Sequence, residues 1–351
     1  MTTTTTTTLG VAREVLSETR QEQDSQVQSD TFEDVFVVGV PSVASDSSTT
    51  TTTFTSEQVK ARLDAQLAKM RLKDKKSKQL SKEDLSIIYE DDHVIVVDKP
   101  SGVLTVSGNN EFPSLAQAVY EALQDDDVCD LVSADRMIVH RLGMDTSGLI
   151  VMAKDMEAVR GLNTVFRNRQ VERKYEALVC GHMEKDRGII DLPIMRDYEF
   201  PPYVRISTDD HQRVLLDIDP EVVGKKILEG PKESITEYEV VSREELDGNP
   251  VTRVSLSSIS GRYHQLNVHL VAFGHPIVGD TTYGLNGYAA SNGGLTDEEL
   301  ESLAPNPQRA SRELQKAISK SAKFPCVHAK SLKFRHPVTD EDVLLTSDAP
   351  F

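Results

Sequence analysis

The sequence lacks the features that would place a protein in a membrane or cross-link it. It has no run of about 18 apolar residues, so no segment is predicted to span a bilayer. The three cysteines, Cys129, Cys180 and Cys326, lie far apart and form no C-x-x-C pair, so neither a disulfide framework nor a zinc site is indicated. We therefore expect an intracellular protein in a reducing compartment, the cytoplasm or the nucleus.

Aromatic residues are scarce, at 5% of 351 residues, and hydrophobic residues reach only 38%. Such contents predict that part of the chain is disordered. Residues 1–55 open with MTTTTTTTLG and close with SDSSTTTTTFT, and because Thr tracts bury almost nothing we predict disorder there. This segment carries eight acidic residues against two arginines, whereas targeting peptides are poor in acid, so organellar targeting is not favoured. Its apolar patch VFVVGV (35–40) is either a strand or a short interaction motif.

The net charge of −17 argues against indiscriminate binding to nucleic acid, because affinity for phosphates comes chiefly from Lys and Arg. It does not exclude a local basic groove on an acidic protein. The best local basic patch is RNRQVERK (167–174), which could contact a phosphate backbone through Arg167, Arg169, Arg173 and Lys174.

Residues 56–84 are predicted to form one amphipathic helix with a basic tail. Two interpretations of this segment stand side by side. It could be an arm that contacts phosphates, or a solvated linker helix, and the second is favoured because charge runs are usually solvated. The apolar residues expected near one side of the helix are Val59, Leu63, Leu67, Met70 and Leu72.

From Leu85 onward the sequence shows the patterns of β-strands. Residues 85–104 are predicted to hold two strands with an acidic turn between them, followed by a Pro-Ser-Gly turn. Further strands are expected at 149–155 and 174–181, with the helix MEAVRGLNTVFRNR between them. The segment RYHQLNVHLVAFG is predicted as a strand that turns into a helix, which Gly274 caps.

Three later segments, ESITEYEVVSRE, TRVSLSSIS and HAKSLKFRHP, alternate as antiparallel strands would. We therefore predict one α+β domain over residues 85–351, with a central, mostly antiparallel mixed sheet flanked by helices and loops. Residues 285–323 are predicted to be a polar helical insertion at its surface.

Four short polar segments rich in Gly and His sit at the ends of the expected strands: DKPSG (98–102), HRLGMDTSG (140–148), SGRYHQLNVH (260–269) and GHPIVGDTTYG (274–284). Arg offers a planar fork of donors and His one or two ring nitrogens, so such segments could hold a phosphate or a ribose. A lone His of this kind is more often a hydrogen-bonded structural residue. No set of aligned metal ligands is evident, and the absence of G-x-S-x-G disfavours a hydrolase.

Taken in order, these segments resemble the RluA-type family of RNA pseudouridine synthases. The resemblance runs from about Ile87 to Phe351. It is carried by IIYEDDHVIVVDKPSGVLTVSG, VHRLGMDTSGLIVMAKD, VERKYEALVCG, GIIDLPI, ESITEYEVV, SGRYHQLNVHLVAFGHPIVGDTTYG and VHAKSLKFRHPVT.

The resemblance implies the pseudouridine synthase fold and an isomerase that detaches uracil from its ribose, rotates it and rejoins it through carbon, without a cofactor or a metal. The partner it implies is structured RNA, tRNA or rRNA, and we expect a monomer. The reaction needs a carboxylate, as nucleophile or as base at the sugar, and a pocket for a base taken out of its stack. The family's tyrosine in K-x-Y-x-A matches Tyr175, which would pack against the uracil.

Two positions depart from the family pattern. The family's catalytic Asp after His-Arg-Leu is Gly143 here, and the basic residue expected after H-Q-L, which would pair with that Asp, is Asn267. The two losses agree, because a buried cation without its acid is costly. Three readings remain open: a synthase that uses Asp145, an RNA-binding protein that keeps the fold without catalysis, and another reaction on the same scaffold. Asp280 is taken as a turn residue of the family.

Asp145 is the candidate nucleophile or base, although its side chain could instead cap its own turn. Lys99 could add a phosphate contact, although a solvated lysine is favoured. The residues expected to shape the site and to hold sugar, phosphate or RNA backbone are His140, Arg141, Arg262, His264, Gln265, Lys174, Arg173, Arg169 and Arg167.

Overall fold

The computed structural model describes residues 36–38, 54–108, 111–125, 128–303 and 309–351. The disorder predicted for residues 1–55 falls almost entirely outside these ranges. Within that segment the apolar patch contains a strand, β1 (Phe36–Val38), which pairs in parallel with β6 (Arg187–Asp191). The strand interpretation of the patch is therefore confirmed.

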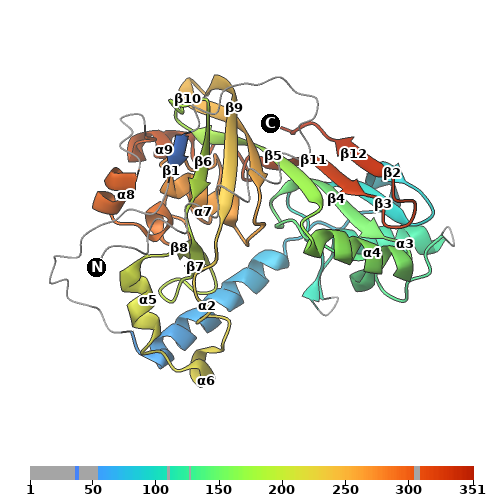
Figure 1. The fold of residues 1–351 in the computed structure, drawn as a ribbon, viewed down its shortest axis with the longest axis horizontal. Coiled ribbons are helices and arrows are strands. Elements are labelled where there is room, and N and C mark those ends of the chain that lie inside the picture. The colour runs from blue at the N-terminus through green and yellow to red at the C-terminus, as the bar shows by residue number, and fades with distance from the viewer. Residues whose placement is uncertain (1–35, 39–53, 109–110, 126–127, 304–308) are drawn as a thin grey trace, which may run out of the picture. The chain divides into compact units, whose positions relative to one another are not determined.

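A mixed sheet lies at the centre of the described chain (Figure 1), in the order β1-β6-β9-β10-β5-β11-β4-β3-β2, with β12 paired to β11. Among the described strands of this sheet only β1–β6 and β4–β11 pair in parallel, so the predicted mostly antiparallel sheet and the α+β class are confirmed. A second, two-stranded sheet joins β7 (Ile194–Arg196) to β8 (Val204–Ile206). The other strands are β2 (Ser86–Glu90), β3 (Val94–Lys99), β4 (Ser147–Ala153), β5 (Val171–Cys180), β9 (Ile235–Leu246), β10 (Asn249–Ser258), β11 (Val327–Arg335) and β12 (Asp342–Thr346).

Helices cover the sheet at several places (Figure 1). The α-helices are α2 (Ser56–Asp74), α3 (Leu115–Asp125), α4 (Met156–Arg167), α5 (Asp209–Leu215), α6 (Pro220–Val223), α7 (Gln265–Ala272), α8 (Asp297–Leu303) and α9 (Arg312–Ile318), and short 3-10 turns occur at Lys82–Asp84, Ala134–Met137 and Ser291–Gly294. No helix in the described ranges is long and apolar enough to cross a membrane.

Strands β3 and β4 are buried on both faces, which explains their nearly unbroken apolar sequences. Because side chains alternate along a strand, Ile95 and Ile150 lie on the face that α3 covers. Their neighbours Val96 and Val151 lie on the face that α4 covers. The turn that precedes β4 is thus attached to a strand with little freedom to move.

The sheet around β5, β9 and β10 packs against α7 in the largest hydrophobic cluster. Helix α7 ends as predicted at Gly274, whose φ is +87°. The N–H groups of Gly274 and His275 bond the carbonyls of Val271 and Leu270, the pattern of a Schellman cap. The predicted strand before this helix is wrong, because residues 262–264 form a turn in which His264 takes a left-handed conformation.

Helix α2 corrects the interpretation of residues 56–84. The helix ends at Asp74, and only Val59 is buried, in a cluster with residues of α5 and α6. Leu67 and Leu72 stay 42% and 60% exposed, since Leu72 projects from nearly the opposite side of the helix to Val59. The helix is therefore not amphipathic along its length, and most of its residues are exposed, although Val59 anchors it.

Within residues 285–323 the structure places a 3-10 turn, α8 and α9. Residues Ala310, Leu314 and Ile318 pack against side chains of β5 and β10, including Leu178 and Val251. This part of the chain covers an edge of the domain core.

Buried histidines make the fold sensitive to acid. His269 lies in the core with its ring nitrogens bonded to Thr236 and Leu192, and burial lowers its pKa to about 4. Burial likewise lowers the pKa of His211 to about 3 and that of His275 to about 4. Between pH 6.5 and these values the unfolded chain binds protons that the folded chain does not, so folding weakens as pH falls.

We predict that the free energy of unfolding drops on acidification from pH 6.5 to 4.5, by on the order of 1 kcal/mol per pH unit for each such histidine. Urea titrations at several pH values measure it. The variant His269→Gln should be less stable at pH 7 but lose less stability on acidification. An unchanged slope in that variant would contradict the assignment.

Candidate active site

A buried lysine fixes the turn 140–148. Lys99, at the end of β3, is 0% exposed, and its ammonium donates to the carbonyls of Pro100 at 2.9 Å, Val103 at 2.8 Å and Met144 at 3.0 Å. Burial lowers the pKa of Lys99 to about 7, and the negative charges of Asp145 and Asp98 oppose that shift. The expected phosphate contact of Lys99 is wrong, because this side chain holds backbone instead.

Hydrogen bonds with Thr105 and a hydrogen bond within the turn itself hold the rest of the turn closed. The Thr105 hydroxyl donates to the Leu142 carbonyl at 2.8 Å and accepts from its N–H at 3.2 Å. The Thr146 N–H donates to the Gly143 carbonyl at 3.1 Å. Gly143 is exposed, its φ lies outside the left-handed region, and a Cβ added there would meet only Thr146 Oγ1, at 3.3 Å. Neither space nor backbone conformation therefore requires glycine at position 143.

The carboxylate of Asp145 faces away from its own turn. Its Oδ2 pairs with Nζ of Lys73, on α2, at 2.5 Å, and it accepts no hydrogen bond from the turn among the described residues. The Asp145 side chain is 16% exposed and that of Lys73 42% exposed. Asp145 is therefore a largely enclosed carboxylate with a cationic partner.

Asn267, at the position where the resemblance implies a cation, serves a different acid. Its amide donates to Asp280 Oδ2 at 2.9 Å. The other oxygen of Asp280 accepts the N–H groups of Thr282 at 2.7 Å and Tyr283 at 3.1 Å. Burial raises the pKa of Asp280, while these bonds and the charge of Lys73 lower it. Asp280 thus acts as a turn residue, in agreement with its interpretation from the sequence.

Tyr175 lies two strands away from the turn. On β5 it is opposite Leu256 of β10 and Ala329 of β11, and Ala329 is opposite Gly148, at the start of β4. Two strand spacings correspond to about 10 Å. The half-buried Tyr175 ring packs against the hydrophobic cluster that includes α7. The sheet therefore brings Tyr175 to the same region as the turn that carries Asp145.

The side chains of His140 and Arg173 both lie against the ring of Phe166. The His140 ring stacks on Phe166 with centroids 4.7 Å apart, and its Nε2 accepts the Val151 N–H at 3.0 Å. Burial and the charge of Arg173 lower the pKa of His140 to about 3, so the ring is neutral. The Arg173 guanidinium lies 5.9 Å from the Phe166 centroid, and a Cβ added at Gly261 would come 2.6 Å from its nitrogen. Arg173 thus connects the turn before β4 to the turn after β10.

The turn after β10 is organised by Gln265. This side chain is buried: its oxygen accepts from the Arg262 N–H at 2.9 Å and the Ser260 hydroxyl at 2.8 Å, and its nitrogen donates to β9. His264 stacks on Tyr263 with centroids 3.9 Å apart, and burial together with the Lys73 charge lowers its pKa to about 3. Gln265 therefore shapes the turn and has no free hydrogen-bonding group to offer a ligand.

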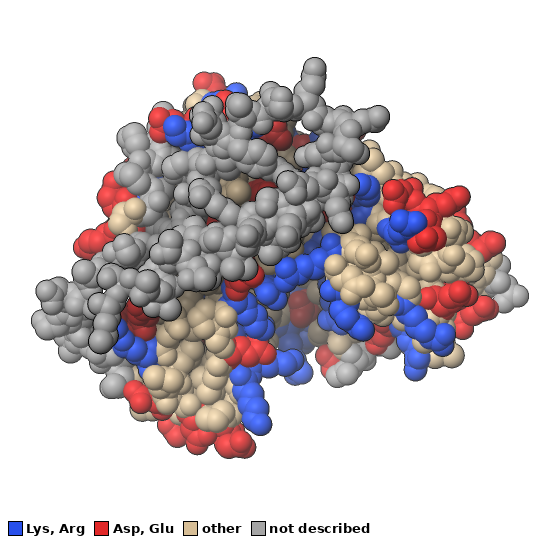
Figure 2. Space-filling view, viewed as in Figure 1, with Lys and Arg blue, Asp and Glu red and all other residues tan. Residues whose placement is uncertain are grey.

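The expected cations divide into two groups. Arg173 is half-buried, and Arg262 donates from Nε to the Glu233 carbonyl at 3.3 Å. The side chains of the remaining four are exposed and form no hydrogen bond or ion pair with other described residues: Arg141, Arg167, Arg169 and Lys174. Figure 2 shows Lys and Arg side chains gathered along and beside α2, while acidic side chains are spread over other parts of this face.

Two residues of this site were missed from the sequence. Phe166 was placed in a helix without a role, and Lys73 was placed among solvated charges. The lysine-rich stretch from Lys69 to Lys78 carries no local signal that one member reaches a carboxylate so far along the chain.

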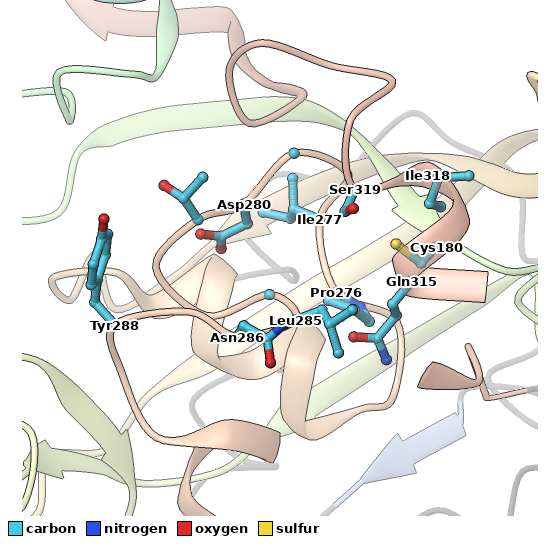
Figure 3. Close-up of a pocket in the computed structure, with 13 residues that line it drawn as sticks. Cys180, Pro276, Ile277, Asp280, Leu285, Asn286, Tyr288, Gln315, Ile318 and Ser319 are labelled. Carbon is cyan, nitrogen blue, oxygen red and sulfur yellow. The ribbon is translucent and has the colours of Figure 1, made fainter. Parts of the chain in front are cut away.

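A separate cavity of about 250 Å³ lies beside the turn that follows α7 (Figure 3). Burial raises the pKa of its thiol, Cys180, to about 12, so that group is not a nucleophile. Among the described residues no group of three or more His, Cys, Asp or Glu side chains could hold a metal ion. The turn residue Asp280 thus lies in the lining of this cavity, which offers no reactive group of its own. Its other polar lining includes Thr281, Asn286, Tyr288, Gln315 and Ser319.

Comparison with known proteins agrees with this geometry. A family model described as RNA pseudouridylate synthase matches residues 93–272. The chain belongs to this family, and the α+β fold with its turns at the strand ends is that of a pseudouridine synthase.

The relatives are of the RluA type. The chain is 36% identical over 259 residues to the dual-specificity RNA pseudouridine synthase RluA of Pasteurella multocida, covering 73% of this chain and 90% of that protein. It is 33% identical over 269 residues to the RluA of Haemophilus influenzae, covering 76% and 94%. Among solved structures, human RNA pseudouridylate synthase domain containing 1 matches with a TM-score of 0.52 and 25% identity, over 78% of this chain and 87% of that one.

Gly148 allows the close contact between β4 and β11. Its φ is +114°, and an added Cβ would lie 2.4 Å from the Ala329 nitrogen. We predict that Gly148→Ala lowers the free energy of unfolding by on the order of 3 kcal/mol or more. The matched control is Gly143→Ala, in the same turn but with room for a methyl group, which should change stability by about 0.5 kcal/mol at most. Urea unfolding of both variants tests this, and equal effects would refute the steric argument.

Proposed function

We propose that this protein isomerises uridine to pseudouridine in structured RNA, tRNA or rRNA, and that Asp145 provides the carboxylate of the reaction. The observation that carries the proposal is the placement of Asp145: it is largely enclosed, paired with Lys73 and turned away from its own backbone. Family membership supports the reaction class, and the RluA relatives are named as RNA pseudouridine synthases.

The chemistry asks for what this site offers. Isomerisation breaks the bond between the ribose C1′ and N1 of uracil, forms a bond from C1′ to C5 and moves a proton from C5 to N1, so nothing is oxidised or reduced. A carboxylate can assist at the sugar as a nucleophile or as a base. The Oδ1 atom of Asp145 forms no bond with any described residue and could take that part, while Oδ2 keeps its partner.

A carboxylate two residues along the turn must still reach the sugar. One extended residue spans about 3.3 Å, and a misplacement of about 1 Å can cost 100-fold in rate. The bonds of Lys99 and Thr105 fix the turn, so Asp145 is presented in one conformation. The proposal therefore requires that bound RNA bring its ribose to the place where this turn holds the carboxylate.

The other predicted site residues take supporting roles in this proposal. Tyr175 packs against the uracil, and His140 and Gln265 hold the two turns in shape. Arg173 and Arg262 face the region between those turns. The exposed cations that bind the RNA backbone, despite the net charge of −17, are Arg141, Arg167, Arg169 and Lys174.

The deciding experiment measures conversion of uridine to pseudouridine in total tRNA and rRNA by the full-length protein. We expect conversion by the natural protein and a loss of about 10²–10⁴-fold or more in Asp145→Asn, which keeps the shape but not the charge of the side chain. The companion variant is Gly143→Asp, which restores the acid that the resemblance implies at an exposed position where an added Cβ would meet only Thr146 Oγ1, at 3.3 Å.

Each other outcome is informative. Conversion that survives Asp145→Asn would reject Asp145 and direct attention to another acid. Conversion by Gly143→Asp alone, with RNA bound by both proteins, would make the natural chain an RNA-binding protein that has lost the reaction.

The exposed arginines at the end of α4 should set the salt dependence of RNA binding. Replacing Arg167 and Arg169 by Gln removes two cations that have no partner among the described residues. We predict that the slope of log Kd against log salt falls in magnitude by about 1 to 2. The control is Arg213→Gln, which removes an exposed cation paired with Asp210. A slope unchanged from that of the natural protein would place the RNA elsewhere.

A further inference from the structure

The candidate site needs a cation that the expected position does not provide. Asn267 is neutral, and its amide is bonded to Asp280. Lys99 is near enough for its charge to interact with that of Asp145, but its ammonium donates to three carbonyls and burial lowers its pKa to about 7. Neither residue can hold the carboxylate of Asp145.

We propose that Lys73 of α2 is the positioning residue of the active site: it holds the Asp145 side chain in its orientation through an ion pair, in place of a cation at position 267. The inference rests on the proposed function of Asp145. Its direct support is the 2.5 Å ion pair between Lys73 Nζ and Asp145 Oδ2. The ion pair uses Oδ2, and Oδ1, which forms no hydrogen bond with any described residue, stays free for the sugar.

Helix α2 is fixed on both sides of Lys73. Upstream, Arg62 donates to the Glu199 carbonyl at 3.0 Å and Gln66 to the Tyr203 hydroxyl at 2.9 Å. Downstream, the Ser77 hydroxyl donates to the Pro113 carbonyl at 2.7 Å, and the Lys78 N–H donates to the Gly102 carbonyl at 3.1 Å. Lys73 is thus delivered by a helix anchored beside β8 at one end and beside the loop next to the Asp145 turn at the other.

The charge of Lys73 reaches all three turns of the site. Besides pairing with Asp145, it acts with burial to lower the pKa of His264, and it counters the rise that burial gives the pKa of Asp280. These two residues belong to the turns that follow β10 and α7. A single ammonium group therefore couples three segments that are distant in sequence.

The test compares Lys73→Met with Lys73→Arg and with a control on the same helix, Lys60→Met, whose exposed partner is Asp64 at 2.8 Å. Under single-turnover conditions with saturating RNA, we expect Lys73→Met to lower the rate by about 100-fold. Its Tm should stay near that of the natural protein, because a partly exposed ion pair contributes little to stability. Lys73→Arg should recover much of the rate, and Lys60→Met should match the natural protein.

A rate in Lys73→Met equal to that of the natural protein would overturn the proposal. So would a defect confined to RNA affinity that saturating RNA removes, since Lys73 would then be a phosphate contact. The double variant Lys73→Met with Asp145→Asn should be no slower than Asp145→Asn alone.

A second readout does not depend on catalysis. Amide hydrogen exchange in the turn 142–146 should quicken in Lys73→Met and not in Lys60→Met, because the turn loses its link to α2. If exchange quickens but the natural protein converts no uridine, the ion pair stands and the proposed function fails. Unchanged exchange in an active Lys73→Met variant would reject the role of Lys73 alone.

Discussion

The arrangement of the site depends on a short contact between β4 and β11. Only two residue pairs join these strands, Ser147 with His328 and Gly148 with Ala329. Through them the half of the sheet that carries Tyr175 meets the half that carries the Asp145 turn. The contact is reinforced by a chain of polar groups that begins in the core: the buried Ser147 Oγ bonds His328 Nδ1 at 2.9 Å, and His328 Nε2 bonds the half-buried Ser347 Oγ at 3.2 Å. Ser347 in turn donates to Asp98.

A second constraint in the sheet is a buried acid that pairs with cations on both neighbouring strands. Glu176, next to Tyr175, is buried between Arg253 at 2.8 Å and Lys330 at 2.5 Å, which ties β5 to both neighbouring strands. Burial alone would raise the pKa of Glu176, but the hydrogen bonds from these two cations outweigh it and lower the pKa. The two cations that flank Glu176 are therefore already paired with an acid, whereas the cations left for RNA are exposed: Arg141, Arg167 and Arg169 on turns and at a helix end, and Lys174 on β5. A chain with a net charge of −17 can present a positive surface in this way.

Local pattern in the sequence was enough for the elements whose burial is uniform. The apolar runs of β3 and β4, and the Gly274 cap of α7, follow from side-chain periodicity and backbone sterics alone. Periodicity misled at α2, where Leu67 and Leu72 were placed near the same side of the helix as Val59 and Leu63 but do not join the cluster in which those two residues pack.

Lys99 and Lys73 show more clearly which contacts cannot be predicted from the sequence. From the sequence Lys99 looked like an exposed lysine of a Pro-Ser-Gly turn, and its burial depends on carbonyls that the turn before β4 brings to it. The partner of Lys73 lies on that same turn, and a surface lysine and a turn aspartate carry no mark of each other. Asn267 stands where the family pattern has a cation, and its bond to Asp280 could not be foreseen because Asp280 already had a plausible role in its own turn.

The position of α2 also affects where the boundaries of the functional domain lie. The family match ends at residue 272 and begins at residue 93, so it omits both α2 and β11. A fragment cut to those limits would lack the strand between β5 and β4 and the lysine that faces Asp145. The smallest unit able to assemble the site is therefore wider than the segment that the family model matches, and it includes chain on both sides of that segment.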